Sequence, residues 1–78
     1  MEIEGKIKKI VLDILDLSES ELDFDKMLRA DLGATSVDLV EIVAEIENQF
    51  DIDIADEDAE KLMTMNDIVA YLKEKTSG

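Results

Sequence analysis

The sequence has no cysteine, no histidine, no proline and no tryptophan among its 78 residues. Without cysteine there is no disulfide framework, no thiolate nucleophile and no cysteine metal site. Without histidine the chain lacks the commonest general base, proton shuttle and transition-metal ligand. The usual nucleophile–base pairs cannot be assembled, because a serine hydroxyl needs an adjacent base before it can attack. These absences predict a protein that other enzymes act on, rather than an enzyme.

Long apolar runs are also missing. No stretch approaches the ~20 apolar residues of a membrane-spanning helix, and the N-terminus does not resemble a signal peptide. We therefore expect a soluble, monomeric, cytoplasmic protein that does not insert into membranes. The length predicts a single domain over residues 1–75, with a frayed tail at 76–78.

Basic residues are scarce, since the chain has 8 Lys and Arg against 21 Asp and Glu, for a net charge of −13. The imbalance is concentrated in residues 31–60, which hold eleven acids and no Lys or Arg. Such a segment repels nucleic acid and anionic lipid and favours partners with basic surfaces. A solvated surface that only keeps the domain soluble is the alternative.

Apolar residues spaced at i, i+3 and i+4 predict amphipathic helices over 3–15, 36–50 and from Thr64 to about Lys75. Acids in a first turn predict a short helix over 56–62. Between the first two helices the periodicity is lost, which indicates a long loop with a helical turn around 25–28. We predict an all-α fold, a small four-helix bundle with a long first loop and a short third helix. The residues expected to hold that loop on the core are Leu22, Phe24, Met27, Leu28 and Leu32.

The helix over 36–50 carries two apolar faces. The larger face, centred on Ile42 and Ile46, is expected to meet the core. A second strip consists of Val37, Val40 and Ala44, and it is edged by carboxylates. An apolar centre with a charged rim is typical of a docking surface, but internal packing against loops explains the strip equally well. The carboxylates of the rim are Asp38, Glu41, Glu45 and Glu47.

The same helix begins with a capping signature, in which Thr35 is the N-cap and Asp38 follows three residues later. Gly33 supplies the turn that precedes it. Ser36 is then the first helical residue, beside backbone N–H groups that have no intrahelical partner. A phosphate on its hydroxyl would lie at the positive end of the helix dipole. Serines at helix starts are common, however, so position alone does not assign a function.

The acid-rich segment after Phe50 suggests a calcium loop, but it fails the EF-hand pattern. Its sixth position is Asp56 where glycine is needed, and its twelfth is Leu62 where glutamate is needed. We predict no specific metal site, only weak binding of divalent cations to many carboxylates.

The motif D-L-G-A-T-S-V-D at 31–38 resembles the prosthetic-group attachment motif of acyl carrier proteins, usually D-L-G-A-D-S-L-D. The similarity continues through A-E-I-E-N-Q-F-D-I-D-I-A-D-E-D-A-E-K-L and T-M-N-D-I-V-A-Y-L, and so covers nearly the whole chain. The resemblance implies that a phosphopantetheinyl transferase attaches 4′-phosphopantetheine to Ser36. Acyl groups would then be carried as thioesters on the arm and presented to fatty-acid or polyketide enzymes with basic surfaces.

The resemblance also favours docking as the role of the second strip and its rim. We expect the partner surface to include acids of the third helix as well. There the added partner-binding residues are Asp56, Glu57 and Glu60. A core that parts to shelter an acyl chain implies a pocket between helices. Its expected lining residues are Leu39, Val43, Ile46 and Ile68.

Several residues depart from the family pattern. Thr35 replaces the usual aspartate before the modified serine, and Leu28 and Arg29 stand where a phenylalanine and a small or acidic residue are frequent. These differences point to a specialised carrier, whereas the charge and the length also suit the main fatty-acid carrier. Two alternatives stay open: a carrier of an amino acid or another group, and an unmodified acidic helical adaptor that binds a basic partner.

Overall fold

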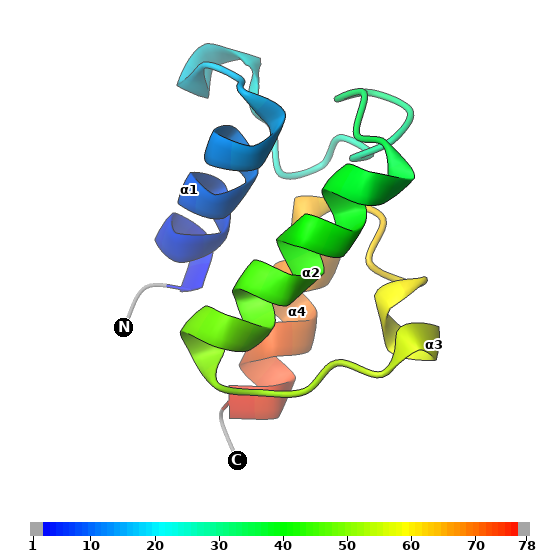
Figure 1. Cartoon of the computed structure of the whole chain (residues 1–78). Coiled ribbons are helices and arrows are strands. Elements are labelled where there is room, and N and C mark those ends of the chain that lie inside the picture. Colours follow the sequence, from blue (N-terminus) through cyan, green and yellow to red (C-terminus); the bar gives the residue numbers. More distant parts are fainter. Residues whose placement is uncertain (1–2, 77–78) are drawn as a thin grey trace.

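The computed structural model describes residues 3–76 and contains four α-helices. They are α1 (Ile3–Leu15), α2 (Ser36–Phe50), α3 (Asp56–Ala59) and α4 (Met65–Thr76). Helix α2 lies between α1 and α3, and α4 runs behind it (Figure 1). No strand occurs within residues 3–76, where one isolated bridge pairs Met27 with Thr64. The predicted all-α architecture, with a long first loop and a short third helix, is confirmed.

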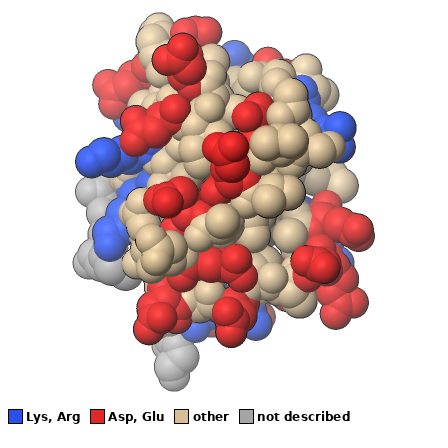
Figure 2. Space-filling model, in the orientation of Figure 1, with Lys and Arg blue, Asp and Glu red and all other residues tan. Residues whose placement is uncertain are grey.

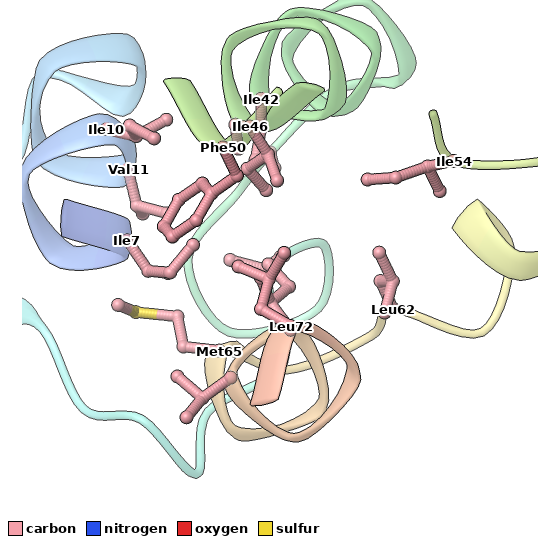
Figure 3. Packing of buried hydrophobic residues seen from close by; sticks show 14 residues of the cluster. Ile7, Ile10, Val11, Ile42, Ile46, Phe50, Ile54, Leu62, Met65 and Leu72 are labelled. Carbon is pink, nitrogen blue, oxygen red and sulfur yellow. The ribbon is translucent and has the colours of Figure 1, made fainter. Parts of the chain in front are cut away.

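Fourteen apolar side chains form a single core, to which α1, α2 and α4 contribute the most (Figure 3). Ile7, Ile46, Met65 and Leu72 are completely buried. Each comes from a helical position that repeats at three or four residues, as amphipathic helices require. Helix α3 contributes no buried residue, and the chain on either side of it supplies Ile54 and Leu62 instead.

The long loop differs from its prediction in one place. The expected helical turn around 25–28 is absent, and a single 3₁₀ turn forms at Glu19–Glu21 instead. The Ser18 N–H and Oγ–H both donate to Glu21 Oε1, at 3.1 and 2.8 Å, which stabilises that turn. Met27 is drawn into the bridge with Thr64, and the Leu28 N–H donates to the Met63 carbonyl at 2.8 Å. The pairing with a distant segment stands beside local turns, since the Lys26 N–H donates to the Asp23 carbonyl at 3.1 Å and the Asp31 N–H donates to the Met27 carbonyl at 3.0 Å.

Among the residues expected to fix the loop, Leu28 is buried and Met27 is not. Met27 is 37% exposed, because its backbone lies in the bridge while its side chain faces outward toward a groove described below. The other three pack against the core as partly buried side chains. They are Leu22, Phe24 and Leu32.

Helix α3 is shorter than the predicted 56–62, since it ends at Ala59. Beyond it, the Lys61 N–H bonds the Asp58 carbonyl and the Leu62 N–H bonds the Ala59 carbonyl, at 3.0 and 3.1 Å. These are tighter i to i−3 bonds, which turn the chain so that Leu62 enters the core. At the other end of the chain, α4 continues one residue beyond the prediction to Thr76, whose Oγ1 donates to the Leu72 carbonyl at 2.7 Å. The rest of the predicted frayed tail, 77–78, lies outside the described residues.

Candidate functional site

The start of α2 has the geometry that the sequence predicts. Thr35 has an extended conformation, and its Oγ1 accepts a hydrogen bond from the Asp38 N–H at 3.1 Å. The Asp38 Oδ2 accepts from the Thr35 N–H at 2.9 Å, which completes the capping box. Ser36 is the first helical residue, and its side chain is exposed.

A tight turn before the cap positions this end of the helix. Gly33 has φ +77°, in the left-handed region that glycine adopts at little cost. The Asp31 Oδ2 accepts from the Met27 N–H at 2.8 Å, and the Ala34 N–H donates to the Leu28 carbonyl at 2.9 Å. Because Ala34 and Leu28 are both buried, the turn is fixed to the core two residues before Ser36.

An apolar groove of about 640 Å³ opens beside Ser36. Helix α2 forms one wall, and α3 with the chain on both sides of it forms the other. The 27–29 segment and Ser36 also line the groove. The apolar side chains of the walls include Leu39, Val40, Val43, Ile54, Leu62 and Met63.

Two of the four residues expected to line an acyl pocket reach this groove. Leu39 and Val43 lie on its wall as partly buried side chains. Ile46 and Ile68 do not line it and are buried in the core, at 0% and 1% exposed. They lie on the faces of α2 and α4 that meet the other helices (Figure 3 labels Ile46).

The apolar strip of α2 is exposed, since Val37 and Val40 are 66% and 68% exposed and Ala44 is also exposed. These exposures exclude internal packing against the loop as the role of the two valines. Val40 and Ala44 also line the groove, so the strip and the groove form one continuous surface.

The acidic residues expected around the strip differ in how free their carboxylates are. Asp38 is committed to the capping box, and Glu47 Oε2 accepts from the Ile54 N–H at 2.8 Å, which holds the connector to α3. Glu45 accepts from Gln49 Nε2 at 3.1 Å and remains exposed. Four further residues are exposed, and their carboxylates have no hydrogen bond or ion pair with another described residue: Glu41, Asp56, Glu57 and Glu60. Acidic side chains spread over the face that α2 and α3 present, and basic ones lie mostly at its margins (Figure 2).

One side chain joins α3 to α4. The Tyr71 hydroxyl donates to Asp58 Oδ2 at 3.0 Å. Burial, and then this hydrogen bond to a carboxylate, raise the pKa of the Tyr71 phenol above its usual value. Helix α3 is therefore held by a polar contact and by its flanking segments, and not by buried side chains of its own.

Sequence reasoning missed the 27–29 segment and Met63 as parts of the groove. Met27 and Met63 come together through the backbone pairing of two loops, for which the sequence has no periodic signal. Arg29 is the only basic residue on the groove among the described residues. Its departure from the family pattern was the one available sign that this position matters.

Comparison with known proteins agrees with the fold. The family described as "Phosphopantetheine attachment site" matches residues 5–72. The solution structure of a "putative acyl carrier protein" from Anaplasma phagocytophilum is 32% identical with a TM-score of 0.89, over 96% of this chain and 89% of that one. A "putative acyl carrier protein" from Mycobacterium tuberculosis is 27% identical with a TM-score of 0.87, over 95% of this chain and 99% of that one.

The chain therefore belongs to the acyl carrier protein family. It is a carrier protein, and its cofactor is 4′-phosphopantetheine, attached covalently. Within residues 3–76, no helix is long and apolar enough to cross a membrane.

Proposed function

We propose that Ser36 is the attachment site and that the chain carries acyl groups for fatty-acid or polyketide biosynthesis. The proposal depends mainly on the position of Ser36, which is exposed, is the first residue of α2 and lies beside an apolar groove. The N–H groups of Ser36 and Val37 have no acceptor among the described residues, and they favour a phosphate at this helix end. The terminal thiol of the arm supplies the group that forms thioesters with the cargo.

The chain's own residues do not activate the serine. With no histidine or cysteine in the sequence, no conventional base stands beside the hydroxyl. A phosphopantetheinyl transferase must therefore bring the base and coenzyme A, while this chain supplies an accessible hydroxyl on a fixed helix end. The capping box keeps that end rigid during the transfer.

The groove is where we propose that an acyl chain lies. Its walls carry Leu39, Val43, Ile54 and Leu62, and it opens at the residue that holds the arm. Burying an alkyl chain there is favourable by about 0.8 kcal/mol for each buried methylene. The exposed strip and the free carboxylates beside it are suited to enzymes that present basic surfaces with an apolar centre.

Intact mass spectrometry after incubation with coenzyme A, Mg²⁺ and a broad-specificity transferase tests the proposal. We expect one added group of about 340 Da. Ser36→Ala should abolish the addition. Ser20→Ala, which removes another exposed serine, should leave it unchanged. A wild-type chain that gains no mass would favour the unmodified adaptor instead.

A further inference from the structure

Arg29 is a basic residue on a groove whose other charged residues are acidic. It lines the groove together with Ser36, and the other charged residues on that groove are Glu47, Asp56 and Glu60. Its side chain is exposed and forms no ion pair with a carboxylate within residues 3–76. The only ion pairs there are Lys8–Glu19 and Lys73–Glu4, and both lie outside the acidic segment 31–60.

We propose that Arg29 binds the phosphodiester of the arm on Ser36, a contact that rests on the attachment proposed above. The phosphorus would be bonded directly to Ser36 Oγ, so its charge lies at the start of α2. The turn just before that start brings Arg29 close, because the Gly33 N–H donates to the Arg29 carbonyl at 3.2 Å, and Arg29 and Ser36 line the same groove. A planar guanidinium matches the two free phosphate oxygens with parallel N–H donors. The free N–H groups of Ser36 and Val37 complete the set of donors.

The acids nearest to Ser36 in sequence form no ion pair with Arg29 and accept backbone N–H groups instead. Asp31 Oδ2 accepts the Met27 N–H and Asp38 Oδ2 accepts the Thr35 N–H. Position 35, where the family motif usually has an aspartate, is an uncharged threonine here. The backbone of Arg29 is also fixed, because its carbonyl accepts the Gly33 N–H at 3.2 Å. The local charge around Ser36 is thus less negative than elsewhere in residues 31–60.

A carboxylate on the cargo would bind Arg29 less well than the phosphate of the arm does. A cargo extends along the groove, where Glu47, Asp56 and Glu60 would repel it. The phosphate, in contrast, stays at the attachment point whatever the cargo. Arg29 would therefore hold the base of the arm against the groove mouth in every loaded form of the carrier.

The test uses the holo protein and three variants. Arg29→Gln removes the positive charge, and Arg29→Lys keeps the charge but loses the parallel N–H donors of the guanidinium. Lys26→Gln removes an exposed positive charge that does not line the groove. For each, ³¹P NMR records the phosphodiester resonance of the holo protein. The melting temperature of the apo and holo forms is measured at low and high salt.

We expect Arg29→Gln to move the ³¹P resonance and Lys26→Gln to leave it in place, with Arg29→Lys between them. The holo-minus-apo difference in melting temperature should fall by about 1–4 °C in Arg29→Gln at low salt, and the effect should fade at 0.5 M NaCl. A ³¹P resonance and a melting difference that respond equally to Arg29→Gln and Lys26→Gln overturn the contact. Arg29→Gln also overturns the contact if both readouts stay unchanged. A chain that gains no mass at all overturns the attachment as well, and mass spectrometry detects that separately.

Discussion

The two sides of α2 have opposite properties. Toward α1 and α4 the helix buries Ile42, Ile46 and Phe50 in a continuous core. Toward α3 it presents Val40 and Ala44 to an open groove. Helix α3 has four residues, none of them buried, so it covers the groove without filling it.

The contrast explains how a small domain combines a fixed fold with an adaptable site. The side of α2 toward α1 and α4 supplies stability through close packing, which tolerates little change. The side toward α3 is held by a few polar contacts, including Tyr71–Asp58 and Glu47–Ile54. Segments with few buried contacts are those that open locally at the lowest free energy. We infer that the groove widens more readily than the core.

The largest expected effect is a loss of stability on the core side. Ile46→Ala should lower the free energy of unfolding by about 2–5 kcal/mol, because it leaves a cavity at a side chain that is 0% exposed. Val40→Ala, on the same helix but 68% exposed, should change it by no more than about 0.5 kcal/mol. Urea unfolding followed by circular dichroism measures both. Equal losses would mean that the two sides do not differ.

Next is the effect on docking at the groove side. Val40→Asp should weaken binding to the transferase by about 1–3 kcal/mol, mainly through faster dissociation. Glu41→Lys should slow association and flatten its salt dependence, since rim charges steer encounter. Surface plasmon resonance at several salt concentrations separates the two rates. Asp13→Lys, the same type of charge change on α1, is the control and should leave both rates near wild type.

A smaller effect concerns charge repulsion. Residues 31–60 carry eleven acids without a basic residue, whereas residues 61–78 have a slight positive excess. Glu57→Gln should therefore raise the melting temperature, and Glu74→Gln should not. Added NaCl or millimolar Mg²⁺ should raise the wild-type value and shrink the difference between the variants. A melting temperature that is flat across low salt would contradict this.

The smallest effect is on the Tyr71 phenol, which can be titrated alone by ultraviolet absorbance because the chain has one tyrosine. Its pKa is raised by burial first and by Asp58 second, so Asp58→Asn should lower it part of the way toward 10.0. The folded state keeps this proton more tightly than the unfolded state. The resulting stability is present below pH 10 and is lost as pH rises through the folded pKa. An unchanged pKa in Asp58→Asn would mean that the contact to α3 does not form in solution.

Periodicity predicted most of the fold, and the reason is visible in α1 and α2. Each is long enough for its apolar spacing to be unambiguous, and the predicted bounds 3–15 and 36–50 match the structure. The capping box at Thr35 is equally local, so the position of Ser36 on α2 followed from the sequence. The Ser18 and Glu21 pair has a similar signature, but the loop around it has no apolar periodicity that would indicate a helix for this pair to begin.

The groove could be predicted only in part, because it depends on contacts between distant segments. From the sequence, Leu39, Val43 and Ile46 are expected to line one pocket, and the structure separates them into groove wall and core. That division is set by the short length of α3 and by the bridge between Met27 and Thr64. Neither feature has a periodic signature in the sequence.

The central claim is that cargo on Ser36 occupies the groove toward α3 and leaves the opposite side of α2 undisturbed. Two-dimensional ¹H–¹⁵N spectra of the holo protein and its octanoyl form test this claim most directly. We predict that the largest shift changes fall on groove residues such as Leu39, Val43 and Leu62, and that α1 residues such as Ile7 and Val11 barely move. Changes centred on α1, or none beyond the residues next to Ser36, would contradict the account.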